Sequence, residues 1–351
     1  MSFQLERLIR RNINNLTPYS SARDEFHGQA NIFLDANENS IGSPLLKWYN
    51  RYPDPYQSKI KEKIASIKGI DPNRQFIGNG SDECIDLLYR AFCEPGIDNV
   101  IICPPTYGMY EVSANINNIE IRKAPLLSNF QLDLESIAGH IDQNTKIIWI
   151  CSPNNPTGNS IHFESVETIL NNFDGLVVVD EAYINFARQK SFTQLLPDYP
   201  NLVILQTLSK AWGLAGLRLG LSFASEEIIR IYNKIKPPYN ISEAVQELIL
   251  QALDHVNDVN EMIKELVRER QWLETELSSI PCVKHIYPSD ANFLLVKVTA
   301  AKAIYDFLLN QQIVVRDRSK VTGCEECLRI TVGTEQENKK LIEALRAFPE
   351  N

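Results

Sequence analysis

A lysine in a small-residue loop that follows a short apolar run constrains this chain more than any other feature. Residues 202–205 are Leu-Val-Ile-Leu, and they lead into a loop over 207–217 that contains Lys210 and ends before Arg218. The apolar run predicts a buried strand, so Lys210 would stand at its carboxyl end, where open α/β sheets bind ligands. A lysine held there and partly desolvated suits Schiff-base chemistry with a carbonyl group, although a purely structural cation is the alternative.

Two more apolar runs end near polar side chains. Residues 176–179 are Leu-Val-Val-Val and end at Asp180, and residues 146–151 run into the loop that contains Asn155. Such runs predict fully buried parallel strands, whose carboxyl ends meet at one edge of a sheet. Asp180 alone would more simply be a helix cap or a turn residue. It is the set of Asn155, Asp180 and Lys210 that indicates a catalytic site.

Several further motifs resemble one enzyme family from residue 34 to residue 334. They are Leu-Asp-Ala-Asn-Glu-Asn at 34–39, Arg-Tyr-Pro-Asp-Pro at 51–55, Gly-Asn-Gly-Ser-Asp-Glu at 78–83, Pro-Thr-Tyr at 105–107, Asn-Asn-Pro-Thr-Gly at 154–158, Ser-Lys-x-x-Gly at 209–213 and Cys-Leu-Arg-Ile-Thr-Val-Gly-Thr at 327–334. Two of them, Asn-Asn-Pro-Thr-Gly and Ser-Lys-x-x-Gly, mark only the wider class I and II aminotransferases. The whole series resembles the histidinol-phosphate aminotransferases, which are fold type I enzymes that use pyridoxal 5'-phosphate (PLP).

This resemblance implies the PLP-dependent transferase fold of type I, an α/β architecture. A large domain would hold a mostly parallel seven-stranded sheet, and a smaller α+β domain would follow it. Alternating apolar runs and helical stretches after residue 55 agree with this expectation. We expect an N-terminal arm over residues 1–30, the large PLP-binding domain over 31–240 and the small C-terminal domain over 241–351, which begins with a long connecting helix at about 242–278.

The arm is predicted to contain an amphipathic helix. Its apolar side chains recur at helical spacing: Leu5, Leu8, Ile9 and Ile13. Such a face needs a surface to lie on, and the family resemblance implies a homodimer with shared active sites. In that dimer Tyr52 would reach across the interface to the cofactor phosphate of the neighbouring subunit.

The resemblance also implies which residues hold the cofactor. Lys210 would bind the PLP aldehyde covalently and then move the reacting proton as base and acid. Asp180 would keep the ring nitrogen protonated, so that the ring acts as an electron sink. A helix start at Gly80 would offer N–H groups to the phosphate dianion. The other expected cofactor contacts are Ser81, Asp82, Thr207, Ser209 and Arg218 near the phosphate, Tyr107 stacked on the ring, and Asn155 and Tyr183 at the ring's phenolic oxygen.

Substrate recognition is expected to depend on anions, because histidinol phosphate carries a phosphate and 2-oxoglutarate carries two carboxylates. The resemblance assigns the carboxylate clamp to Arg329 and a phosphate contact to Arg316. It adds Tyr19 in the arm and Asn155 as further substrate contacts, and it implies a cis bond between Asn155 and Pro156. Arg316 could equally be a solvated loop charge beside Arg318.

Composition excludes some other classes of function. The chain has 351 residues, 44% of them apolar, and a net charge of -9, with no basic stripe that would indicate a nucleic-acid surface. Its apolar runs are far shorter than the roughly 20 residues that span a membrane. The seven cysteines and five histidines show no metal-ligand spacing, and Cys324 and Cys327 form a lone C-x-x-C pair. Unpaired thiols and the absence of a signal-peptide core predict a cytoplasmic protein.

Three alternatives to histidinol-phosphate transamination stay open at this point. The threonine-phosphate decarboxylases of cobalamin synthesis share the fold and many motifs, and release of carbon dioxide separates them from aminotransferases. Aromatic amino-acid aminotransferases use the same reaction type. A non-enzymatic PLP-binding regulatory domain usually carries a DNA-binding extension, for which the sequence offers no helix-turn-helix region.

Overall fold

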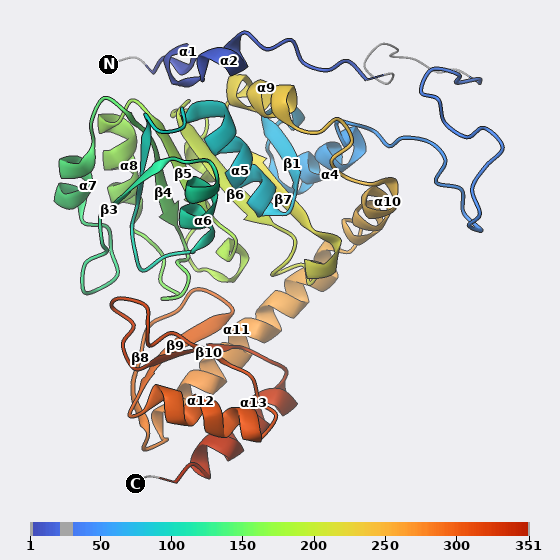
Figure 1. Cartoon of the computed structure of the whole chain (residues 1–351). Helices are drawn as coiled ribbons and strands as arrows, with labels where there is room; N and C mark the ends of the chain where they lie inside the picture. The colour runs from blue at the N-terminus through green and yellow to red at the C-terminus, as the bar shows by residue number, and fades with distance from the viewer. Residues whose placement is uncertain (1–2, 22–30, 350–351) are drawn as a thin grey trace.

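A seven-stranded sheet organises the large unit of the protein. The computed structural model describes residues 3–21 and 31–349, and within them the strand order is β1-β7-β6-β5-β4-β2-β3, with β7 antiparallel to both of its neighbours and the other pairs parallel (Figure 1). The strands are β1 Gln75–Asn79, β2 Asn99–Ile102, β3 Glu120–Lys123, β4 Thr145–Cys151, β5 Leu176–Asp180, β6 Leu202–Thr207 and β7 Leu219–Phe223. This confirms the mostly parallel sheet. β3 was not predicted, because this short edge strand has no fully buried residue and therefore no apolar run.

Helices cover both faces of this sheet, which is why its inner strands are apolar throughout. Side chains of β4 alternate between two cores: Ile148 packs with α4, α7 and α8, whereas Trp149 packs with α5, α6 and α9. The helices of the large unit are α4 Ser58–Lys68, α5 Ser81–Phe92, α6 Met109–Ile116, α7 Leu134–His140, α8 Phe163–Asn172 and α9 Glu226–Ile235, with short 3-10 turns η1 Pro72–Arg74, η2 Ile184–Phe186, η3 Phe192–Leu195 and η4 Ala215–Leu217.

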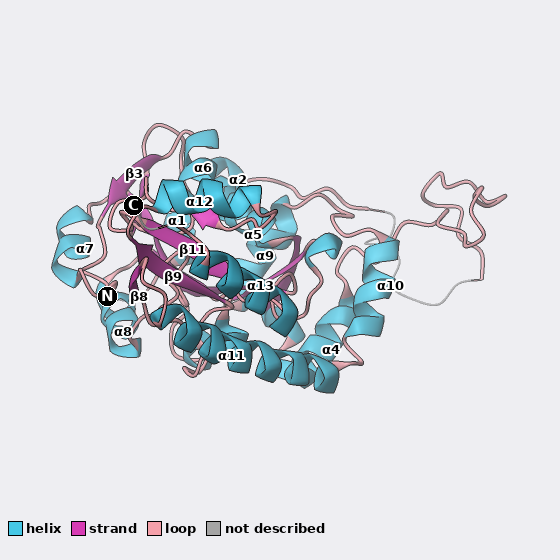
Figure 2. Cartoon of the chain, turned by 90° about the horizontal axis from the view of Figure 1, so that it is seen from below, coloured by secondary structure: helices cyan, strands magenta, loops and turns pink. Residues whose placement is uncertain are grey.

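The small unit is an antiparallel sheet in the order β10-β11-β9-β8, covered by helices (Figure 2). Its core lies between the sheet and α11, α12 and α13. Its elements are β8 Val283–Ile286, β9 Phe293–Val298, α12 Ala301–Asn310, β10 Arg316–Asp317, β11 Cys327–Thr331 and α13 Glu335–Arg346. The two units meet at the loop that contains Asn155, where Asp290 N donates to Gly158 O at 2.7 Å and Ser160 Oγ donates to Asp290 at 2.7 Å.

The connection between the units differs from the single long helix that the sequence predicts. It consists of α10 Glu243–Ala252 and α11 Val256–Ser278. Lys63 of α4 explains the break, because its ammonium donates to Leu250 O at 3.1 Å and pairs with the carboxylate of Asp254. These contacts satisfy the carbonyl end of α10 and stop the helix there.

The N-terminal arm also differs from expectation. Instead of one helix it forms two single turns, α1 Leu5–Leu8 and α2 Arg11–Asn14, and its apolar side chains Leu5, Leu8 and Ile9 pack against the large unit of the same chain. Arg10 fixes the arm to the end of α5 through Ala91 O and an ion pair with Glu94 at 3.2 Å. The apolar face therefore does not need a second subunit, which corrects that argument for a dimer. Residues 22–30 of the expected arm lie outside the described residues.

No helix in the described ranges is both long enough and apolar enough to span a bilayer. All seven cysteines are buried, and none of them forms a disulfide.

The closest backbone approach in the large unit joins β7 to the start of α5. A Cβ added at Gly220 would lie 2.2 Å from both Gly80 C and Ser81 N. Gly220→Ala should therefore push α5 away and lower the free energy of unfolding by roughly 1–3 kcal/mol, as overpacking does. Gly216→Ala is the matched control, because nothing lies within 4 Å of its added Cβ. Denaturant unfolding of both variants tests this, and equal midpoints for the two would contradict it.

Candidate active site

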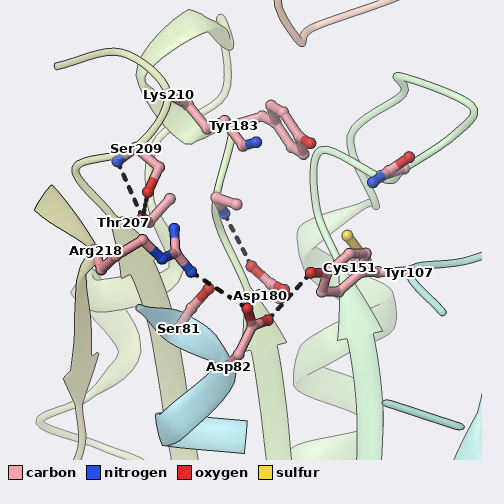
Figure 3. Close-up of a pocket in the computed structure, with 12 residues that line it drawn as sticks. Ser81, Asp82, Tyr107, Cys151, Asp180, Tyr183, Thr207, Ser209, Lys210 and Arg218 are labelled. Atoms are coloured by element: carbon pink, nitrogen blue, oxygen red, sulfur yellow. Dashed lines mark hydrogen bonds and ion pairs between the residues drawn. The ribbon is translucent and has the colours of Figure 1, made fainter. Parts of the chain in front are cut away.

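The carboxyl ends of β4, β5 and β6 open into a small pocket with a cavity volume of about 90 Å³. The pocket brings together ten residues that the sequence singled out: Ser81, Asp82, Tyr107, Asn155, Asp180, Tyr183, Thr207, Ser209, Lys210 and Arg218 (Figure 3). The strand register causes this, because Cys151 of β4 pairs with Asp180 of β5, and Asp180 pairs with Leu205 of β6. Cys151 also lines the pocket and was not expected there.

Asp180 is a buried carboxylate at the floor of the pocket, only 2% exposed. Its Oδ2 accepts a hydrogen bond from Tyr110 Oη at 2.7 Å, and its Oδ1 accepts one from the backbone N of Ala182 at 3.0 Å. Burial raises the pKa of Asp180 to about 6, and the bond from Tyr110 opposes that rise. A cationic partner bound next to this carboxylate would therefore offset the free-energy cost of burying its charge.

Lys210 faces the open side of the same pocket. Its Nζ lies 5.7 Å from the centre of the Tyr183 ring. Although the residue is exposed to the pocket, surrounding protein removes water from the ammonium and lowers its pKa, and repulsion from Arg329 lowers it further. A lysine with a lowered pKa is more often neutral, which is the form that attacks a carbonyl.

The start of α5 and Arg218 form a cradle for an anion. No side chain caps the first turn of α5, and Gly80 has φ +75 at its N-cap, while Arg218 has φ +55. Gly80 N donates to Arg218 O at 2.7 Å, and a Cβ at Gly80 would lie 2.6 Å from the Arg218 guanidinium. Helix N–H groups and a guanidinium therefore converge on one point. Thr207 and Ser209 add hydroxyls beside them, with Thr207 Oγ1 donating to Ser209 Oγ at 3.0 Å.

Asn155 connects the pocket to the small unit. Arg329 of β11 donates to Asn155 Oδ1 at 2.6 Å, and its guanidinium carbon lies 5.2 Å from the centre of the Phe293 ring. The Asn155–Pro156 peptide bond is cis, as predicted. Two other cis bonds, before Pro105 and before Pro153, were not predicted.

Three arginines of the small unit gather next to this contact. Arg316 lies directly opposite Arg329 in the antiparallel pair β10–β11, so both side chains project from the same face of the sheet. Arg318 is half-buried, and burial together with the positive charge of Arg316 lowers its pKa. Within the described residues none of the three has a carboxylate partner, and the Nε atoms of Arg318 and Arg329 are buried without a hydrogen bond. The sequence singled out Arg316 and Arg329 but not Arg318, and Arg316 itself is exposed.

Two residues expected at the site stand apart from this pocket. Tyr52 is 50% exposed and stacks on Tyr239 with 4.4 Å between ring centres. Tyr19 is 75% exposed and does not line the pocket. Neither reaches the cofactor position of its own chain in the described structure.

Sequence reasoning also missed Tyr110 and Glu181. Tyr110 lies in the first turn of α6, three residues after Tyr107, which precedes the helix. Glu181 is fully buried and accepts hydrogen bonds from Ser191 Oγ at 2.6 Å and Gln206 Nε2 at 2.8 Å. A carboxylate adjacent to Asp180 was the available signal for Glu181.

Comparison with known proteins identifies the family. The family model for aminotransferase class I and II matches residues 45–345. A histidinol-phosphate aminotransferase of Cytophaga hutchinsonii is 53% identical over 348 residues, which cover 99% of this chain and 100% of the relative. The chain belongs to the histidinol-phosphate aminotransferase family of class I and II aminotransferases. It is therefore an aminotransferase of a PLP-dependent class.

Solved structures of this aminotransferase family share the fold. The histidinol-phosphate aminotransferase of Clostridium acetobutylicum superposes with a TM-score of 0.77 at 26% identity, covering 85% of this chain and 90% of that one. The enzyme of Sinorhizobium meliloti, in complex with PLP, superposes with a TM-score of 0.78 at 24% identity, covering 84% and 82%. These likenesses confirm the fold type that the sequence predicted.

The residues present fit PLP. The uncapped start of α5 and the cradle beside Arg218 suit a phosphate dianion. The buried Asp180 suits a protonated ring nitrogen, and Lys210 with its lowered pKa suits the aldehyde. Arg218 keeps most of its donors free, because its ion pair with Asp82 is long, at 3.5 Å.

The ionised side chain of Asp180 should destabilise the cofactor-free protein. A carboxyl pKa raised from 3.8 to about 6 means that the ionised side chain destabilises the fold at neutral pH by about 3 kcal/mol. Folding then favours the protonated form, so this cost is absent below about pH 4, grows between pH 4 and pH 6, and is complete above pH 6. Asp180→Asn should stabilise the cofactor-free protein at pH 7.5 and little at pH 4, while its turnover falls by several orders of magnitude. Denaturant unfolding at the two pH values measures the first effect, and near-normal turnover would contradict the role of Asp180.

Proposed function

We propose that this aminotransferase transfers the amino group of L-histidinol phosphate to 2-oxoglutarate, which yields imidazole-acetol phosphate and glutamate in histidine biosynthesis. The observation that carries the proposal is the group of Arg316, Arg318 and Arg329 next to the cofactor pocket, none of which has a carboxylate partner in the part of the chain that the structure describes. A substrate with a phosphate dianion and an acceptor with two carboxylates both need such a group. The whole-length similarity to a protein named for this reaction supports the same substrate.

Each polar group of the pocket then has a task. When bound, PLP supplies an electron sink for the negative charge that develops on the substrate carbon. Lys210 holds the cofactor in the resting enzyme, and its freed amine then removes the proton from that carbon and returns it in the reverse direction. Asp180 keeps the ring nitrogen protonated, and Tyr183 and Asn155 donate to the ring oxygen.

The phosphate of the cofactor and the anions of the substrates would be held separately. Gly80, Ser81 and Asp82 contribute the start of α5, while Thr207, Ser209 and Arg218 complete the cofactor's phosphate site. Arg329 would clamp the carboxylate of 2-oxoglutarate, since it already donates to Asn155 at the pocket wall. Arg316 and Tyr19 would contact the substrate phosphate, and Tyr107 would stack on the ring.

A paired assay tests this substrate choice. Purified protein should transaminate histidinol phosphate with 2-oxoglutarate more efficiently than it does phenylalanine or tyrosine, and threonine phosphate should release no carbon dioxide. Arg316→Gln should lower kcat/KM for histidinol phosphate by roughly 10- to 100-fold, because a charge-assisted hydrogen bond is lost, and should change phenylalanine turnover little. A stronger preference for aromatic amino acids, or release of carbon dioxide, would establish one of the alternative functions instead.

We further propose a homodimer with shared active sites, an arm over residues 1–30 and domains over 31–240 and 241–351. The segment between the arm and α4 supports the dimer, because it extends away from the large unit and exposes large apolar side chains (Figure 1). These exposed side chains include Ile32, Leu34, Ile41, Leu45, Leu46, Trp48 and Tyr52. A patch of this kind on a segment without its own core favours a second protein surface. Seven buried cysteines outside any disulfide support a reducing cytoplasmic location.

Subunit mixing tests the shared site. Lys210→Ala removes the catalytic amine, and Tyr52→Phe removes the hydroxyl that would reach the neighbouring cofactor. If sites are shared, a hybrid dimer holds one site with both residues intact, so mixing the two variants should restore activity above the sum of the parents. Differently tagged subunits verify that hybrids form. Hybrids that form without any gain in activity would contradict the role of Tyr52.

A further inference from the structure

A single neighbouring side chain donates a hydrogen bond that favours the ionised form of Asp180. In the described part of the chain its carboxylate accepts two hydrogen bonds, from Tyr110 Oη at 2.7 Å and from Ala182 N at 3.0 Å. The second comes from the adjacent backbone and would remain with any residue at position 182 except proline. Tyr110 is therefore the side chain on which the state of Asp180 depends.

Packing holds Tyr110 in this position. The residue is fully buried, and its ring stacks on Trp149 at 4.9 Å and 14° between planes. Tyr107 closes the other side in an edge contact at 5.6 Å. This packing holds the hydroxyl beside Asp180, with the Cys151 thiol of β4 as its other polar neighbour.

The other groups around Asp180 do not replace this bond. Asp82 on α5 repels the carboxylate, and Lys210 after β6 attracts it. The remaining titratable neighbours, which are Cys84 on α5, Tyr107 before α6, Cys151 on β4 and Tyr183 after β5, are neutral at physiological pH because burial raises the pKa of each. Burial also raises the pKa of Tyr110 well above its usual value, so this phenol stays a donor at every working pH.

We propose that Tyr110 is a positioning residue for transamination. Its buried hydroxyl holds Asp180 ionised and oriented, so that the proton shared between Asp180 and the cofactor's ring nitrogen stays on the nitrogen. This inference rests on the proposed cofactor site and adds a residue that touches neither cofactor nor substrate. Loss of the hydroxyl would make Asp180 a better competitor for the shared proton. The ring would then lose part of its capacity as an electron sink.

Tyr110→Phe tests the proposal, because it keeps the ring packing and removes only the donor. Tyr89→Phe is a matched control: Tyr89 is equally buried, its ring lies 5.3 Å from that of Trp149, and its hydroxyl donates to Tyr110 O at 2.8 Å and not to Asp180. Two measurements are made without substrate. Carbon-13 NMR of labelled aspartate follows the titration of Asp180 in the cofactor-free protein, with Asp180→Asn to assign the signal. Nitrogen-15 NMR of labelled PLP reports whether the bound ring nitrogen is protonated.

Tyr110→Phe should move the Asp180 midpoint from about pH 6 upward by about one unit, which corresponds to a roughly tenfold change in its proton affinity. The ring-nitrogen signal should move toward its unprotonated position. Tyr89→Phe should leave both signals at their wild-type values. If Tyr110→Phe does not fold, 3-fluorotyrosine placed at position 110 keeps the packing and strengthens the donor, so the midpoint should move to lower pH.

The outcomes separate this inference from the proposed function. An unchanged midpoint in the Tyr110 variants, or an equal shift in Tyr89→Phe, would overturn the coupling to Asp180. A shifted midpoint with an unaltered nitrogen signal would overturn the positioning role. An unprotonated ring nitrogen in the wild-type protein would instead contradict the proposed cofactor site.

Discussion

The register between β4, β5 and β6 is the constraint on which the rest of the site depends. Asp180 ends β5 opposite Cys151 of β4, and Glu181 N donates to Leu205 O of β6 at 2.7 Å. The buried carboxylate of Glu181 strengthens this alignment, because it accepts from Gln206 on β6 and from Phe192 N in the following loop. A shift of one residue along any of these strands would turn the polar strand ends away from one another.

Desolvation gives the aligned groups their reactivity. The same low-water environment raises the pKa of Asp180 and lowers that of Lys210, so each group sits nearer its neutral form than it would in water. Both effects cost stability in the cofactor-free protein and favour a ligand that carries a ring cation and an aldehyde. Desolvation of Asp180 and Lys210 therefore contributes both to cofactor binding and to chemical reactivity in this pocket.

Anion recognition comes from a different part of the chain. β10 and β11 place Arg316 and Arg329 on one face of the small sheet, and Arg329 reaches Asn155 across the boundary between the two units. The contact of Asp290 with Gly158 lies on the same loop. Movement of the small unit would thus act directly on Asn155, a residue that lines the cofactor pocket.

The sequence by itself determined the strand ends that bear Asn155, Asp180 and Lys210, because short apolar runs followed by polar residues leave few alternatives to buried parallel strands. It also determined the helix start at Gly80 and the family. Only the tertiary structure decided which neighbours set the charge of these groups: Tyr110 faces Asp180 from 70 positions away, and Arg318 proved half-buried. It also placed the arm against its own chain and divided the connecting helix between Ala252 and Val256. Those outcomes depend on contacts between distant segments, which local periodicity does not encode.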